Sequence, residues 1–412
     1  MVLNNAVIGF STHTIIIKFT PQQGDFSLQQ QTDRTCAIDY LRTSMTVLVL
    51  LLHSMLAYPT WGRFEPSHYL ISTAPIIDPI KWNGFDLPPT LINNFFMALM
   101  FFISGLFVWK SIAKKGPAHF LKDRGIRLGI PFSISLVVIM PLAYYPSFLM
   151  TGSKEDFFTY WIGWSWNSGP AWFISLLLVF NLIAVGCFGC FSKSSSALPA
   201  VVFTRSSVFF LALLALSLAG LIPLLYLFGP FQWIYLNQLI IGQASKLALY
   251  LVYFLAGVAV GAHGIENSIF TPDGPLSRNW FYWVIASVFS TLFLIISLAA
   301  MHLNATDPWK PSTGWLQLGV SITLYSATLS LTFMAIFLRF VNTRNALIDS
   351  LSNHAYGIYL VHYPFVTWSQ YEMLDSTIHP ALKAFIVFCL SLGLSWATTS
   401  LIRSIPTVRK II

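Results

Sequence analysis

Long apolar stretches constrain this chain more than any other feature of its sequence. About ten of them, each roughly 20 residues long, are dominated by Leu, Ile, Val and Phe, and this is the length an α-helix needs to cross a bilayer. They lie at roughly 39–59, 90–110, 130–150, 171–191, 208–228, 246–263, 280–302, 315–338, 353–371 and 381–402. Only 9% of the residues are charged, whereas a soluble protein has about a quarter. The sequence therefore predicts an all-α polytopic membrane protein, a bundle of about ten transmembrane helices.

The distribution of Lys and Arg predicts how this bundle is oriented. If Asp39 begins the first span from the cytoplasm, the inner loops hold 17 of the 23 Lys and Arg residues and the outer loops hold 6. The acidic residues divide evenly, 7 inside and 8 outside, so the bias is the one that the positive-inside rule describes. Both termini are then predicted to be cytoplasmic, and the net charge of +8 needs no nucleic-acid partner.

The domain organisation predicted from these stretches is simple. Residues 1–35 form a cytoplasmic N-terminal tail, residues 36–405 the transmembrane domain, and residues 406–412 a short C-terminal tail. The longest loop has only about 30 residues, so function is predicted to reside in the helices and their loops. Of the four cysteines, Cys187 and Cys190 end an apolar span, where thiols behave mostly as small hydrophobes, and no metal site is predicted.

The first span carries ionisable residues. Asp39 and Arg42 lie where the apolar stretch begins, and His53 interrupts it further along. Arg42 and His53 are eleven residues apart, which places them on one helix face about 16 Å apart along the axis. Asp39, three residues before Arg42, is its predicted counter-ion. An ionisable group at membrane depth is costly and marks a function by default, although a structural interhelical hydrogen bond of His53 is the alternative.

The most basic loop follows the second span. Arg124 and Arg127 are three residues apart, so in a helix both guanidinium groups point the same way, just before Pro131 opens the third span. Forked guanidinium groups at the inner face suit a phosphorylated ligand. The alternative is a topogenic cluster that touches anionic membrane lipids, and this alternative is favoured for the lysines of the same loop.

Two further features leave their roles open. His362 lies in the ninth span beside Pro364, which frees a backbone carbonyl, and read alone it is more typical of a structural residue than a catalytic one. Four tryptophans, Trp161, Trp164, Trp166 and Trp172, are of the kind that stack on a sugar ring, but an aromatic belt at the membrane interface is the favoured explanation.

Taken in order, these motifs resemble the membrane-bound acyltransferase 3 family from about residue 34 to 402. The resemblance is carried by the segments Arg34–Arg42, His53, Phe101–Gly105, Arg124–Pro131, Trp172-Phe173 and Tyr356–His362. One departure is Asn93-Asn94, where many members have Arg or His shortly before the Phe-Phe-x-x-Ser-Gly stretch.

The resemblance implies an integral-membrane O-acyltransferase, expected in the inner membrane of a bacterium. Acyl-CoA, with acetyl-CoA as the expected form, is the implied co-substrate, no bound cofactor is implied, and the acceptor is a hydroxyl of a glycan, lipid or small molecule. His53 matches the essential histidine and Arg42, paired with Asp39, its companion. The residues matched to the donor side are Arg124 and Arg127, and those matched to a supporting role are His362 and Tyr359.

Desolvation favours a neutral imidazole, which is the form a general base requires. Two other classes of protein remain as alternatives: a proton-coupled transporter of a small anionic solute, in which His53 and His362 relay protons, and a catalytically silent scaffold. The transporter class tends to show paired halves with interrupted helices, and no such internal repeat is visible.

Overall fold

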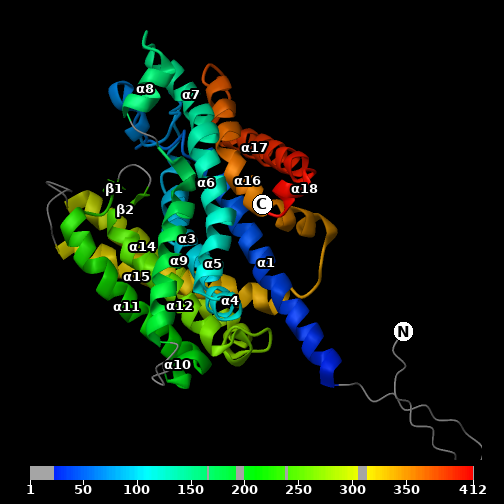
Figure 1. The fold of residues 1–412 in the computed structure, drawn as a ribbon. Helices are drawn as coiled ribbons and strands as arrows, with labels where there is room; N and C mark the ends of the chain where they lie inside the picture. The colour runs from blue at the N-terminus through cyan, green and yellow to red at the C-terminus, as the bar shows by residue number, and fades with distance from the viewer. Residues whose placement is uncertain (1–22, 165–166, 192–198, 237–239, 305–312, 412) are drawn as a thin grey trace, which may run out of the picture.

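The structure, a computed structural model, describes residues 23–164, 167–191, 199–236, 240–304 and 313–411. The helices form a bundle, with the C-terminal helices against one side (Figure 1). In this described part of the chain, nine helical segments are long and apolar enough to cross a membrane: Cys36–Met55, Asn83–Lys115, Pro117–Thr151, Gly169–Cys190, Ser206–Phe228, Ala244–His263, Trp280–Met301, Gly314–Phe340 and Pro380–Arg403. The predicted all-α polytopic membrane protein is thereby confirmed.

The tenth predicted span is a long helix of different composition. Helix α16 (Ala346–Glu372) contains the predicted span 353–371, but its polar residues exclude it from the nine apolar segments. It nevertheless packs against α1 (Gln23–Met55), α7 (Met140–Thr151) and α17 (Pro380–Arg403). This helix is therefore in contact with three others, and its polar residues His362, Thr367 and Gln370 are buried. The side of the membrane on which the termini lie stays a prediction.

Prolines and glycines divide the second and third spans into shorter pieces. The second span comprises α2 (Pro88–Asn93), α3 (Phe96–Gly105) and α4 (Val108–Lys115). The third comprises α5 (Pro117–Arg124), a π-helical turn (Gly125–Gly129), α6 (Ile130–Ile134), a second π turn (Ser135–Ile139) and α7. Pro131 has no N–H, so it cannot bond the carbonyl of Arg127, and the helix winds wider there.

The other described elements complete the bundle. They are α8 (Phe157–Trp164), α9 (Trp172–Phe191), α10 (Ala200–Thr204), α11 (Ser206–Phe228), α12 (Leu247–His263), α13 (Pro275–Arg278), α14 (Trp280–Asn304), α15 (Thr313–Phe340) and α18 (Pro406–Arg409). Large apolar side chains are exposed along α11, α14 and α17, for example Leu227, Phe289 and Leu401. Such faces would be a liability in water and are expected where a helix meets lipid.

A small sheet lies in the segment between the fifth and sixth apolar stretches. Strands β1 (Trp233–Leu236) and β2 (Ile240–Gln243) pair antiparallel there, with Trp233 opposite Gln243. The Gln243 amide donates to the carbonyl of Pro230 at 2.5 Å. This hairpin lies at the end of the bundle opposite α4, α5 and α10 (Figure 1).

Helices α3 and α12 approach each other more closely than side chains would permit. A Cβ atom at Gly257 would lie 2.1 Å from the carbonyl oxygen of Phe102, and one at Gly261 would lie 2.1 Å from that of Leu106. A Cβ at Gly105 would lie 2.2 Å from the carbonyl oxygen of Phe254. The pattern Gly257-x-x-x-Gly261 is the small-residue spacing that lets membrane helices pack backbone to backbone.

We expect Gly257→Ala to destabilise the protein, because the added methyl group meets the backbone of α3 rather than a flexible side chain. Overpacking of this kind costs about 1–3 kcal/mol or more. Gly186→Ala on α9 is the matched control, since a Cβ there has nothing within 4 Å. The melting temperatures of both variants in detergent test the prediction, and equal values for the two would contradict it.

Candidate functional site

Two histidines from opposite parts of the sequence meet inside the bundle. His53 lies in the last turn of α1, and His362 lies in the middle of α16. Their ring centroids are 5.2 Å apart, and Nε2 of His362 is 3.4 Å from Nδ1 of His53. The sequence identified both residues but gave no reason to bring them together, so their contact is new information from the fold.

Backbone carbonyls define how each ring is protonated. Nδ1 of His53 is 2.9 Å from the carbonyl oxygen of Val49, and Nδ1 of His362 is 2.7 Å from that of Tyr359. A carbonyl only accepts, so each neutral ring is assigned its proton on Nδ1 and a lone pair on Nε2. The lone pair of His362 then faces the Nδ1–H of His53, which is shared between Val49 and His362. Nε2 of His53 remains able to accept a proton.

The two rings differ in accessibility. His362 is completely buried, whereas His53 keeps part of its surface accessible. A reacting group can therefore reach His53, and His362 can act only through it.

A glutamine on α16 fixes the end of α1. The last carbonyls of a helix lack intrahelical partners. The Gln370 side chain donates to the carbonyl of His53 at 2.9 Å and to that of Ser54 at 3.4 Å. Gln370 thus positions the His53 backbone, a role that the sequence analysis missed. The available signal was a polar amide two turns beyond His362 within the same predicted span.

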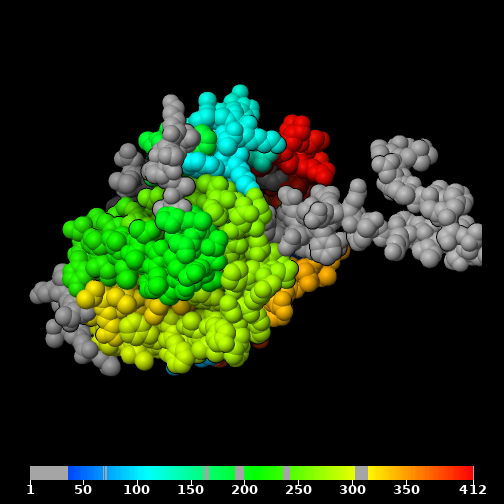
Figure 2. All heavy atoms as spheres, turned by 90° about the horizontal axis from the view of Figure 1, so that it is seen from below, coloured from blue at the N-terminus to red at the C-terminus, as the bar shows by residue number. Residues whose placement is uncertain are grey.

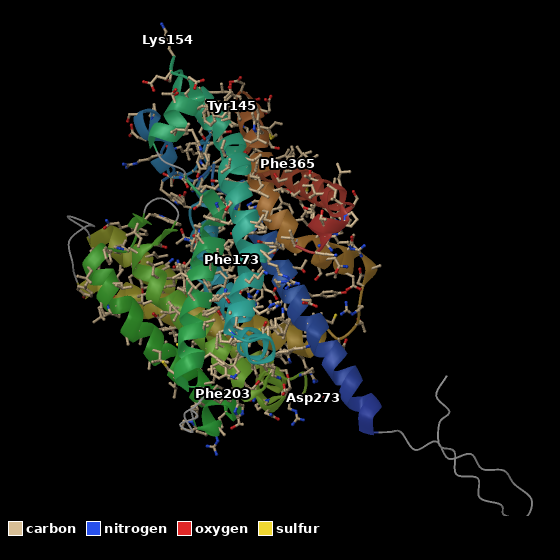
Figure 3. The ribbon with its side chains drawn as sticks, in the orientation of Figure 1. Tyr145, Lys154, Phe173, Phe203, Asp273 and Phe365 are labelled. Carbon is tan, nitrogen blue, oxygen red and sulfur yellow. The ribbon has the colours of Figure 1, made fainter. Side chains whose placement is uncertain are left out.

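Aromatic side chains surround the histidine pair. The Tyr363 ring lies 5.2 Å from that of His53, and Tyr144 lies 5.9 Å from Tyr363. Tyr359 donates its hydroxyl proton to the carbonyl of Pro170, and its ring lies 6.1 Å from that of Phe173. Phe173 is central in the bundle (Figure 3). The loop that precedes α9 is therefore held against α16 one turn from His362.

The arginine motif is connected to the histidines through α16. The Tyr356 hydroxyl donates at 3.0 Å to the carbonyl oxygen of Arg127, the carbonyl to which Pro131 cannot donate. Tyr356 precedes His362 by six residues, which is about 9 Å along the helix. Tyr356, Tyr359 and His362 thus form a series on α16 that contacts the third span, the loop before α9 and His53 in turn.

The two arginine side chains lie in different surroundings. Arg124 ends α5 with its guanidinium carbon 5.0 Å from the centroid of the Phe120 ring and is half-buried. Arg127 lies in the π turn and is exposed. Figure 2 views this end of the molecule, where atoms of α4 and α5 are at the surface. Both arginines are thus available to a ligand from this end.

The predicted pair of Asp39 and Arg42 forms, but it is open to solvent. The guanidinium of Arg42 is 3.5 Å from the Asp39 carboxylate, with the two side chains 48% and 32% exposed. Exposed pairs of this kind contribute little to stability. Tyr40 makes the closer connection, since its hydroxyl donates to Asp349 at 2.8 Å and ties α1 to the first turn of α16. The charged neighbours stand out in the sequence, whereas the role of Tyr40 becomes visible only in the fold.

The remaining sequence candidates are placed as follows. Trp161 packs in a cluster with Tyr144, and Trp172 begins α9. Trp166 lies outside the described residues, and the side chain of Trp164 is not described. Among the described residues, no group of His, Cys, Asp or Glu has the arrangement of a metal site.

Comparison with known proteins identifies the family. Neither a search of curated proteins nor a search of solved structures found a match. The family model of the acyltransferase 3 domain matches residues 37–400, which is nearly the whole chain. It spans both histidines and the arginine motif. The chain therefore belongs to the acyltransferase 3 family and is an integral-membrane acyltransferase.

Proposed function

We propose that this protein moves an acyl group, acetyl by preference, from acyl-CoA to a hydroxyl of a glycan, lipid or small-molecule acceptor. The observation that carries the proposal is the contact between His53 on α1 and His362 on α16. Helix α16 also bonds the turn that contains Arg127, through the Tyr356 hydroxyl. Family membership supports acyltransferase chemistry over the transporter and scaffold alternatives. We assign the protein to the inner membrane of a bacterium, with the donor on the cytoplasmic side.

His53 is the general base in this mechanism. Its Nε2 takes the proton of the acceptor hydroxyl as the oxygen attacks the thioester carbonyl. The carbon–sulfur bond then breaks, and the proton passes to the departing thiolate, so that an ester and CoA-SH are the products. His362 accepts the Nδ1–H of His53 and so stabilises the positive charge that develops on the ring. No covalent acyl-enzyme is needed.

The arginines hold the donor. Arg124 and Arg127 bind phosphate oxygens of CoA, for which a guanidinium fork is suited. Arg42, held by Asp39, orients the acyl-pantetheine arm at the start of α1. Since about 16 Å of helix separates Arg42 from His53, the arm must enter the bundle from the arginine end.

A labelled donor tests the proposal directly. The full-length protein in vesicles is supplied with acetyl-CoA labelled in the acetyl group, and glycans, lipids and small molecules are analysed by mass spectrometry. The expected result is an acceptor heavier by one acetyl group, only where the protein is present. Uptake of a solute with no loss of acetyl from CoA would refute the proposal and favour a transporter.

The donor site predicts a specific kinetic change. Arg124→Gln and Arg127→Gln are each expected to raise the KM for acetyl-CoA about 10-fold or more, since a hydrogen bond to a charged group contributes about 1.5–3 kcal/mol. The KM for S-acetylpantetheine, which lacks the phosphates, should stay unchanged. Lys114→Gln, an exposed charge of the same loop, is the control. Equal losses with both donors would contradict the assignment.

A further inference from the structure

A lysine is buried at the end of the bundle opposite the arginines. Lys246 directly precedes α12 and is only 4% exposed. No hydrogen bond or ion pair joins its ammonium group to any residue that the structure describes. A buried cation without a partner is costly, so such a residue is typical of a site that receives an anion. A lysine at a helix end normally extends its ammonium group to the membrane interface, so the burial of Lys246 is unusual.

Aromatic rings lead from the surface to this lysine. Tyr250 lies one helical turn after Lys246, on the same face of α12, and is buried. Its ring is 5.9 Å from that of Trp172, which in turn is 5.9 Å from that of Trp233 in β1. Trp233 is exposed, Trp172 is half-buried and Tyr250 is buried, so the three rings descend into the bundle. Flat aromatic faces beside a cation suit a ring-shaped ligand that carries a negative charge.

The same loop that carries Trp172 reaches the histidine pair. Ser168, four residues earlier, is buried, and its hydroxyl has no partner among the described residues. A Cβ atom at the adjacent Gly169 would lie 3.2 Å from the Tyr363 ring, and that ring contacts His53. The loop therefore joins the aromatic neighbours of the lysine to the base, and it carries the unpaired Ser168 hydroxyl.

From these contacts we infer that Lys246, Tyr250, Trp172 and Trp233 form the acceptor site and that the acceptor is an acidic carbohydrate. Lys246 pairs with a carboxylate or phosphate of the sugar, the aromatic rings pack on its faces, and a hydroxyl of the sugar is presented to His53. The inference rests on the proposed transfer to a hydroxyl and adds its substrate class. The chemistry that decides it is the negative charge, because a neutral sugar would leave the ammonium group unpaired.

Thermal unfolding of the full-length protein in detergent tests binding without catalysis. Glucuronate and glucose 6-phosphate are compared with glucose, the matched neutral sugar. We expect the two anions to raise the melting temperature by several degrees and glucose to have no effect. Lys246→Met should abolish the shift while leaving the unliganded protein at least as stable, because it removes an unpaired buried charge. Lys154→Met removes an exposed lysine at the same end (Figure 3) and should keep the shift.

A transfer assay separates this inference from the proposed function. In vesicles supplied with labelled acetyl-CoA, Lys246→Met should raise the KM for glucuronate at least 10-fold with little change in kcat. Equal use of glucose and glucuronate, an unchanged shift in Lys246→Met, or stabilisation by anionic phospholipid alone would overturn the acidic-sugar site while leaving acyl transfer intact. If no acceptor is acetylated but the Lys246-dependent shift remains, the proposed transfer fails and the anion site stands.

Discussion

Replacing His53 with alanine is expected to lower kcat about 10²–10⁴-fold, the range that general base catalysis typically contributes. The donor should still bind, because Arg124 and Arg127 do not depend on the imidazole. The turn that contains Arg127 contacts α16 at Tyr356, about two helical turns from His362. The KM for acetyl-CoA is therefore expected to change little. Turnover of labelled acetyl-CoA in membranes checks the prediction, and full turnover by His53→Ala would exclude the role of this residue.

A second histidine on α16 offers a matched control. His354 bonds the carbonyl of Ser350, four residues before it, just as His53 bonds the carbonyl of Val49. His354 lies eight residues before His362, which is about two helical turns, and it contacts neither histidine of the pair. His354→Ala should keep wild-type turnover. The turnover of His362→Ala should lie between those of His53→Ala and His354→Ala, because this change removes only the acceptor for the Nδ1–H of His53. Identical losses in all three variants would indicate general destabilisation rather than catalysis.

The apolar pattern predicted most of the architecture, because the requirement for about 20 apolar residues per crossing leaves few alternatives. It was least informative for α16, which packs against three other helices and buries the polar residues His362, Thr367 and Gln370. Hydropathy measures how well a helix suits lipid, so it does not identify a helix that is surrounded by protein on several sides. Four residues of the candidate site, Tyr356, Tyr359, His362 and Gln370, lie on that helix.

The candidate site was predicted residue by residue but not as an arrangement. The cost of burying an ionisable group singled out His53, and the helix-perturbing proline drew attention to His362. Their contact depends on how α1 packs against α16, which no local pattern contains. Gln370 and Tyr40 were missed for the same reason, since each acts across that interface through a hydrogen bond to the other helix. Lys246 was counted only as an outer charge, because its burial arises from neighbours distant in sequence.

The largest effect on stability is expected at an ion pair that anchors the first outer loop. Lys383 on α17 lies 2.6 Å from Asp78 of the loop, and both side chains are almost completely buried, at 0% and 1% exposure. The other carboxylate oxygen of Asp78 accepts from the backbone N–H of Ile80. Burial, together with the negative charge of Asp78, raises the pKa of the nearby Tyr58 hydroxyl, so Tyr58 stays neutral beside the ion pair.

Lys383→Met is expected to lower the free energy of unfolding by about 3–5 kcal/mol, because it leaves the Asp78 carboxylate buried and unpaired. The double variant Asp78→Asn/Lys383→Met should recover most of this loss, since asparagine keeps an oxygen for Ile80 and carries no charge. Lys110→Met, which breaks an exposed pair with Glu266 at 3.0 Å, is the control and should have no measurable effect. Chemical denaturation in detergent measures all three.

The same variants connect the loop to the catalytic end of α1. The backbone N–H of Asp78 donates to the carbonyl of Ala57 at 2.9 Å, only four residues beyond His53. Loss of the ion pair should therefore lower acyl transfer as well as stability, and the double variant should restore both together. If Lys383→Met unfolds at the wild-type denaturant concentration, the carboxylate has found another partner and the pair does not anchor the loop. If stability falls but transfer by the folded fraction is unchanged, the loop supports the fold without positioning His53.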